Sequence, residues 1–191
     1  MSQNGIRKLL RDNPLVPVVK IQSLDEVEPL ITALQNNSIN SIEITLRSDC
    51  ALDAIKLAKK SSNDNFSVGV GTVVNTKQLA EVVDAQVDFI VLPGFQKDLV
   101  SALQDIDIPF LPGVVTPSEI METLRLGWDT LKFFPANIAG GLGALKTYGQ
   151  VFSQIKFCPT GGITKENYSE YLDLENVISV GGSWIQKDLK I

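Results

Sequence analysis

The sequence predicts a (β/α)8 barrel, the TIM-barrel fold, built as a single domain from residues 1–191. Short runs of β-branched and apolar residues recur along the chain at a spacing of roughly 21 to 27 residues, and amphipathic helical stretches lie between them. No linker, low-complexity tract or shift in composition divides the chain. About eight strands that alternate with helices are the pattern of this fold, and an open, doubly wound sheet is the structural alternative.

Each predicted strand is rich in Val, Ile or aromatic residues and is followed by turn-forming residues. In chain order the runs are LVPVVKI (15–21), INSIEITL (39–46), FSVGVGTV (66–73), VDFIVLP (87–93), IPFLPGVV (108–115), WDTLKFF (128–134), QIKFCPT (154–160) and NVISVGG (176–182).

The predicted helices begin with an amphipathic N-terminal helix in MSQNGIRKLLRDN and continue with LDEVEPLITALQNN, CALDAIKLAKK, TKQLAEVVDA and PSEIMETLRLG. Capping signals mark several starts: Ser23 with Glu26 three residues on, Asn75 before Thr76, and Thr116 before Pro117. Only IQKDLKI follows Trp184, so the last helix is expected to be truncated or missing.

Composition excludes several functions. The net charge of -5 and the pI of about 4.8 argue against nucleic acid or an anionic membrane as the partner. The chain shows no membrane-length apolar stretch and no targeting peptide, so a cytoplasmic location is expected. Cys50 and Cys158 form neither a disulfide framework nor a metal motif. Because histidine is absent, Ser-His and Cys-His pairs and His-ligated zinc are excluded, and proton transfer falls to carboxylates, lysines, tyrosines or water.

The run WDTLKFF carries one charged residue among apolar and aromatic neighbours. Alternation with period two places Leu131 and Phe133 outward, and Thr130, Lys132 and Phe134 inward. A lysine at a strand end is ordinarily a surface residue whose ammonium reaches water. A dry, inward lysine is instead a candidate nucleophile, because a desolvated surrounding favours the uncharged amine.

The run INSIEITLRS has the same kind of inward face. Ile42, Ile44 and Leu46 are predicted to face the helices, whereas Glu43, Thr45 and Arg47 point into the barrel. Two opposite charges near the C-terminal end of an inward face suit a site better than a core. A purely structural ion pair is the alternative for Glu43 and Arg47.

Two other runs add inward groups by the same alternation. Val16, Val18 and Lys20 are grouped together in LVPVVKI, and Val68, Val70 and Thr72 in FSVGVGTV. Polar or ionisable groups therefore gather at the C-terminal ends of several strands, where barrel enzymes carry their chemistry.

Two late segments, CPTGGIT (158–164) and VGGSW (180–184), each end a strand with a glycine pair. Glycine lets backbone N–H groups approach an anion closely. Barrels often bind phosphate in the loops after strands 7 and 8, where these pairs fall. A single pair is more often a tight turn, but two on neighbouring strand ends indicate a phosphorylated ligand.

Taken together, these motifs closely resemble the 2-keto-3-deoxy-6-phosphogluconate (KDPG) aldolase family, which is also described as acting on 4-hydroxy-2-oxoglutarate (KHG). The resemblance runs in order from about Val16 to Trp184. It rests on EITLR (43–47), GVGTV (69–73), LPG (92–94), PGVVTPSE (112–119), LKFFPA (131–136), CPTGGI (158–163) and VGGSW (180–184).

The resemblance implies a class I, metal-independent aldolase of the Entner-Doudoroff pathway, with no cofactor beyond a Schiff base to the substrate, and a homotrimer. It implies that Lys132 is the Schiff-base lysine and Glu43 the general acid/base, and that Arg47 and Thr72 bind the pyruvate moiety. The remaining implied substrate contacts are Pro93, Phe134 and Thr160 in the pocket wall, Gly161, Gly162, Gly182 and Ser183 at the phosphate, and Lys20, where many relatives have arginine.

The expected reaction is the cleavage of KDPG to pyruvate and glyceraldehyde 3-phosphate, together with that of KHG to pyruvate and glyoxylate. Two alternatives remain at this point. One is a sister aldolase for the 6-phosphogalactonate epimer, and the other is a non-catalytic sugar-phosphate-binding barrel.

Overall fold

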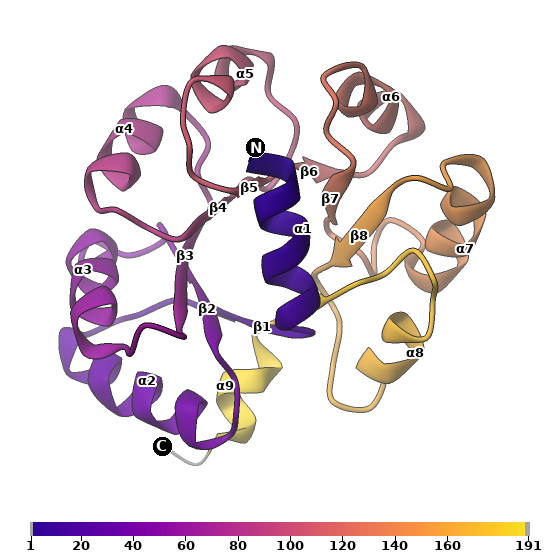
Figure 1. The fold of residues 1–191 in the computed structure, drawn as a ribbon. Helices are drawn as coiled ribbons and strands as arrows, with labels where there is room; N and C mark the ends of the chain where they lie inside the picture. The colour runs from indigo at the N-terminus through magenta and orange to yellow at the C-terminus, as the bar shows by residue number, and fades with distance from the viewer. Residues whose placement is uncertain (1, 190–191) are drawn as a thin grey trace.

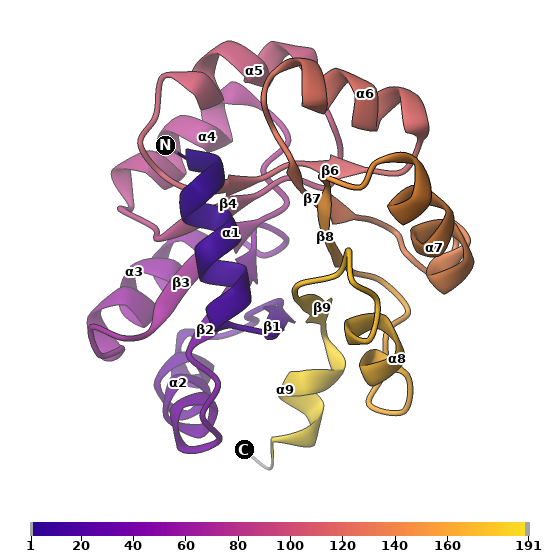
Figure 2. The ribbon, with the colours of Figure 1, turned by 45° about the vertical axis from the view of Figure 1, so that its right-hand side comes forward.

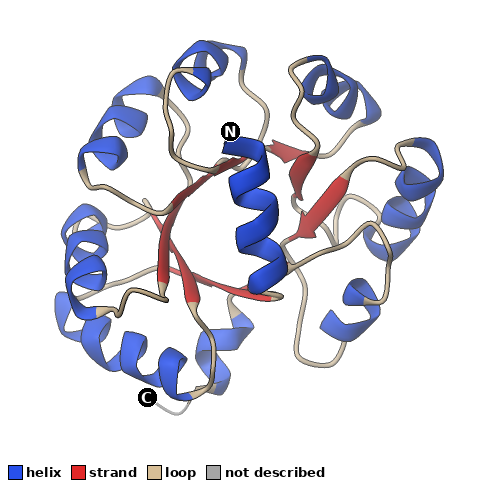
Figure 3. Cartoon of the chain, in the orientation of Figure 1, coloured by secondary structure: helices blue, strands red, loops and turns tan. Residues whose placement is uncertain are grey.

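The computed structural model describes residues 2–189 and shows strands on the inside with helices around them (Figures 1 and 3). The strands are β1 (Leu15–Val19), β2 (Ser41–Thr45), β3 (Ser67–Gly71), β4 (Phe89–Val91), β5 (Phe110–Leu111), β6 (Gly113–Val114), β7 (Thr130–Phe133), β8 (Lys156–Pro159) and β9 (Val180–Gly182). Each lies within one of the predicted runs.

The helices follow the strands as predicted. They are α1 (Ser2–Asp12), α2 (Val27–Asn36), α3 (Ala51–Ser61), α4 (Thr76–Asp84), α5 (Lys97–Gln104), α6 (Pro117–Arg125), α7 (Gly141–Val151), α8 (Tyr168–Leu172) and α9 (Trp184–Asp188), with a 3-10 turn η1 (Leu24–Glu26) before α2. Helix α9 is short, and residues 190–191 lie outside the described part (Figure 2). None of the helices in residues 2–189 is long and apolar enough to cross a membrane.

The strands form two parallel sheets. The larger is curled and has the order β5-β4-β3-β2-β1-β9, and the smaller has the order β6-β7-β8. This sequential order lacks the reversal of a doubly wound sheet. Pro112 separates β5 from β6, because proline has no N–H for the ladder. The arrangement is TIM-barrel-like, with single bridges Phe157–Val177 and Thr160–Gly181 between the β8 and β9 regions.

The convex side of the sheets packs against the helices. Ile42 and Ile44 of β2 are fully buried there with Ala54 and Ile55 of α3, as the alternation predicted. Leu131 and Phe133 of β7 pack outward in a second cluster, which includes residues of α6, α7 and α8. The inward phases of β2 and β7 are therefore confirmed.

The prediction for β3 was wrong. Val68 and Val70 belong to the outer cluster with Ile42 and Ile44, and the inward positions of β3 are glycines. Because a glycine has no side chain to mark its face, the valines alone set the predicted phase. Thr72 still reaches the concave side, because it lies beyond the strand and has a φ of 67°.

Helix α1 closes the end of the sheet where the strands begin (Figure 1). Ile6 and Leu10 pack on inward residues of β1, β4, β5 and β8. Arg7 donates from Nε to Thr130 Oγ1 at 2.9 Å and pairs with Asp129 at 3.0 Å, and the Gln3 side chain bonds the backbone of β5 and β7. The concave side of the sheets is therefore accessible to a ligand from the opposite, C-terminal end of the strands.

Candidate active site

A cavity of about 210 Å³ lies at the C-terminal ends of the strands, where this fold carries its chemistry. It is lined by side chains from β1, β2 and β7 and from the loops that follow β2, β3, β4, β7 and β8. The lining residues are Val18, Glu43, Thr45, Arg47, Thr72, Pro93, Lys132, Phe134 and Thr160. All except Val18 and Thr45 are predicted site residues.

The centre of this cavity is an amine beside a carboxylate. Lys132 Nζ lies 3.2 Å from Glu43 Oε1, and the two side chains are only 6% and 4% exposed. The Phe134 ring lies 5.0 Å from the same nitrogen. Burying two charges is costly unless they pair, so a pair at this depth, open to a cavity, indicates chemistry rather than stability alone.

The sequence explains why these two side chains meet. Lys132 is flanked on β7 by Leu131 and Phe133, whose outward packing forces the lysine inward. Glu43 is held in the same way by Ile42 and Ile44 on β2. The two residues are far apart in sequence and lie on different sheets, so only the curvature of the fold brings them together (Figure 2).

Arg47 is held at the mouth of the cavity by Thr45. Its Nε donates to Thr45 Oγ1 at 3.0 Å, and that hydroxyl donates to the Val19 carbonyl of β1 at 2.9 Å. Thr45 is 2% exposed, whereas Arg47 is exposed. The alternation placed Thr45 on this face but did not reveal its role, because its partners lie on another strand and two residues further along the chain.

Thr72 has a left-handed backbone, with a φ of 67°. This conformation is unfavourable for a β-branched residue and, where it occurs, often marks a functional site. Here it turns the side chain that follows β3 into the cavity, opposite the Lys132 strand. Pro93, from the loop after β4, adds a rigid wall beside it.

The two glycine loops lie side by side beyond the cavity. The Thr160–Gly181 bridge joins their strands, and Gly161 and Gly162 have φ values of 101° and 70°. Gly182 ends β9, and Ser183 precedes α9. None of Gly161, Gly162, Gly182 and Ser183 lines the cavity of Lys132. Lys20 is exposed just after β1 and does not line it either.

Cys158 lies beneath the amine, as the strand partner of Lys132. Burial raises the pKa of this thiol to about 12, and the charge of Glu43 adds to the rise while that of Lys132 opposes it. The thiol is therefore neutral at ordinary pH and is not a nucleophile.

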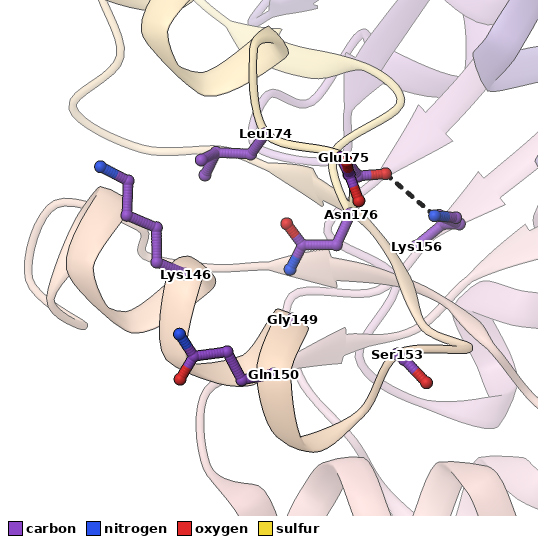
Figure 4. A pocket seen from close by; sticks show the side chains of 8 residues that line it. All are labelled: Lys146, Gly149, Gln150, Ser153, Lys156, Leu174, Glu175 and Asn176. Carbon is purple, nitrogen blue, oxygen red and sulfur yellow. Dashed lines mark hydrogen bonds between the residues drawn. The ribbon is translucent and has the colours of Figure 1, made fainter.

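A larger cavity, of about 390 Å³, lies away from this centre, between α7, the start of β8 and the loop before β9 (Figure 4). Two of its polar groups are already partnered: Lys156 Nζ donates to the Glu175 carbonyl at 2.9 Å, and Asn176 Nδ2 to the Leu145 carbonyl at 2.8 Å. Its lining has no acid–amine pair like that of Lys132, so we do not assign the active site to it. Within residues 2–189 no group of three or more His, Cys, Asp or Glu is placed to hold a metal ion.

Comparison with known proteins identifies the family of the chain. Residues 6–191 match the family model described as KDPG and KHG aldolase. The chain belongs to this family. The KHG/KDPG aldolase of Escherichia coli (strain K12) is 42% identical over 183 residues, which are 96% of this chain and 85% of the relative.

Solved structures of family members are also similar. KDPG aldolase from Legionella pneumophila, which holds pyruvate captured at low pH as a covalent carbinolamine intermediate, superposes with a TM-score of 0.91 and 44% identity, covering 94% of this chain and 86% of that one. The aldolase of Zymomonas mobilis ZM4 with 3-phosphoglycerate has a TM-score of 0.92 and 40% identity, covering 96% and 87%.

Proposed function

We propose that this protein is a class I aldolase, a carbon–carbon lyase that cleaves KDPG to pyruvate and glyceraldehyde 3-phosphate and KHG to pyruvate and glyoxylate. The observation that carries the proposal is the buried pair of Lys132 Nζ and Glu43 Oε1, 3.2 Å apart in a cavity of about 210 Å³. The carbinolamine in the Legionella relative is the adduct that forms when an amine adds to a ketone, which supports the same use of Lys132.

Lys132 attacks the C2 carbonyl of the 2-keto acid, and Glu43 accepts the proton that the amine releases. Glu43 returns that proton to the carbinolamine hydroxyl, which leaves as water, and the resulting iminium draws electrons from the neighbouring bond. Glu43 then removes the proton of the C4 hydroxyl, the C3–C4 bond breaks, and its electron pair forms an enamine on Lys132. Protonation of the enamine at C3 and hydrolysis release pyruvate and restore the amine. The carbon–carbon cleavage thus uses one amine and one carboxylate.

The substrate carboxylate is assigned to Arg47 and Thr72. A guanidinium fork matches a carboxylate in two parallel hydrogen bonds, and Thr45 already fixes the Nε edge of Arg47. The terminal nitrogens of Arg47 make no hydrogen bond or ion pair within residues 2–189 and remain for the ligand. Pro93, Phe134 and Thr160 then form the walls that orient the carbon chain.

The phosphate is assigned to the loops after β8 and β9, at Gly161, Gly162, Gly182 and Ser183. The left-handed glycines let the backbone approach an anion closely. The relative from Zymomonas mobilis contains 3-phosphoglycerate, which supports a phosphorylated ligand in the family. Because Lys20 is exposed at the end of β1, we assign it a weaker, long-range attraction for the substrate anion.

We extend the proposal to the whole chain. The two sheets are taken to be one closed (β/α)8 barrel in a single domain, because only Pro112 separates β5 from β6 and bridges already join β8 to the β9 region. A homotrimer in the cytoplasm is proposed from the family resemblance alone, and equilibrium sedimentation of the purified protein tests the trimer.

Borohydride reduction in the presence of pyruvate tests the function. The expected result is a permanent adduct of the reduced pyruvate imine on Lys132, located by peptide mass spectrometry, with loss of KDPG cleavage. An unmodified Lys132, with activity that needs added metal, would falsify the proposal. Pyruvate binding without turnover by folded protein would favour the non-catalytic alternative. Rates with the two C4 epimers, and with KHG, measure the preference among substrates.

A further inference from the structure

The Glu43 carboxylate lies directly against the backbone of β3. A methyl group added at Gly71 would place its carbon 2.0 Å from Glu43 Oε1, 2.7 Å from Cδ and 2.9 Å from Cγ. Contacts under 3.0 Å are essentially never observed for a real Cβ. Any side chain at Gly71 therefore forces the carboxylate to move.

The oxygen that touches Gly71 is also the one that faces the amine. Glu43 Oε1 accepts from Lys132 Nζ at 3.2 Å, so the same oxygen is close to both the Gly71 backbone and the lysine. Relief of a 2.0 Å contact needs a shift of about 1 Å or more, and a misplacement of about 1 Å can cost roughly 10²-fold in rate.

We propose that Gly71 is a positioning residue for the aldol reaction, because its bare backbone sets the separation of the Glu43 carboxylate and the Lys132 amine. This inference rests on the proposed function. Gly71 does not line the cavity, so it acts through Glu43 and not on the substrate. The steps expected to depend on it are proton transfers to and from Glu43.

The exchange of pyruvate methyl hydrogens with solvent isolates one such transfer. In the iminium of pyruvate on Lys132, Glu43 takes a proton from C3, and the C–H electron pair forms the enamine double bond. Return of a solvent deuteron to C3 regenerates the iminium, and hydrolysis releases deuterated pyruvate, which proton NMR measures. Borohydride trapping measures formation of the iminium separately.

We expect Gly71→Ala to slow the exchange by about tenfold to a hundredfold. After a long incubation the loss of borohydride-trapped adduct should be much smaller, because slower proton transfer to Glu43 delays the iminium but does not prevent it. The matched control is Gly69→Ala, on the same strand and the same face, where the added carbon would lie 2.2 Å from the Phe89 ring. That control is expected to lower the unfolding temperature and to leave exchange at the wild-type rate. Equal exchange in Gly71→Ala and the wild type, or equal loss in both variants, overturns the proposal.

A double-variant cycle covers the case in which Gly71→Ala does not fold. Removing the Glu43 side chain by Glu43→Ala makes room for the new methyl group, so Gly71→Ala is expected to have little effect on unfolding in that background. Strong destabilisation there would show that the contact with Glu43 is not the cause, and would also overturn the proposal. The proposed function fails separately, if wild-type protein forms no adduct with pyruvate.

Discussion

Thr45 joins β1, β2 and Arg47 through a single hydroxyl, so replacing it with valine tests how the substrate carboxylate is held. The hydroxyl donates to the Val19 carbonyl at 2.9 Å and accepts from Arg47 Nε at 3.0 Å. Valine keeps the shape of threonine but makes neither bond. The arginine remains charged and in place, but its guanidinium is free to turn.

The magnitude follows from the bonds that are lost. A hydrogen bond to a charged group contributes about 1.5–3 kcal/mol, and each 1.4 kcal/mol corresponds to about tenfold in binding. We expect Thr45→Val to raise KM for KDPG by roughly tenfold, because the fixed fork of Arg47 is lost. The value of kcat is expected to stay within about twofold, because the Lys132–Glu43 pair is untouched.

Two controls make the assay specific. Thr45→Ser keeps the hydroxyl and should retain a KM near that of the wild type. Thr130→Val removes the equivalent bond from Arg7 Nε to a threonine hydroxyl, 2.9 Å long, at the opposite end of the sheet. This variant should lose about 1.5–3 kcal/mol of stability with no change in KM. An unchanged KM in Thr45→Val, or an equal rise in Thr130→Val, would refute the reasoning.

Three further predictions follow from buried or capped groups. Lys132→Met leaves the Glu43 carboxylate buried without its partner and should lower the free energy of unfolding in urea by about 3–5 kcal/mol. The Lys132→Met/Glu43→Gln double variant should lose less. If the losses of the two single variants add up to that of the double variant within about 0.5 kcal/mol, the two side chains are not coupled. Burial raises the pKa of Cys158 to about 12, so iodoacetamide at about pH 8 should label only the half-buried Cys50 in native protein and both cysteines in urea. Peptide mapping measures the labelling, and equal labelling of the two cysteines in native protein would contradict the prediction. Burial raises the pKa of Glu119, but bonds from the Thr116 and Val115 N–H groups and the Thr116 hydroxyl outweigh it, so the pKa is lowered overall. Glu119→Gln should therefore cost about 1 kcal/mol of folding stability near neutral pH. The difference from the wild type should shrink as the pH falls below about 4, because the carboxylate loses its stabilising charge when it is protonated at its folded-state pKa. A pH-independent difference in urea unfolding would contradict this.

The sequence pattern predicted that Lys132 and Glu43 face inward because both residues lie on strands with strong alternation. Lys132 lies between two large outward residues, and so does Glu43, so each can only face inward. Period-two alternation depends only on neighbouring residues, so it predicts which side chains of a strand face inward when helices pack against its other face. The order of residues along each strand was therefore enough to place this acid and this amine on the concave side.

Other parts of the site depend on features that no local pattern contains. Thr72 faces the cavity through a left-handed φ and not through the phase of its strand. Thr45 acts through a carbonyl on β1, which only the sheet register brings near. Lys20 was grouped with the inward residues of β1, but the strand ends at Val19 and the alternation ends with it. The break at Pro112 did have a signal, since a proline in a strand removes a ladder donor.

The error at β3 shows how the concave side of the sheet is built. Each of three inward side chains lies over a glycine of a neighbouring strand: Phe89 over Gly69, Glu43 over Gly71 and Thr160 over Gly181. A strongly curled sheet has little room on its concave side, so a large side chain fits only where its neighbour has none. Positions without side chains therefore decide where the acid, the wall threonine and the packed aromatic ring lie. The geometry of the site is set by these glycines as much as by the residues that carry the chemistry.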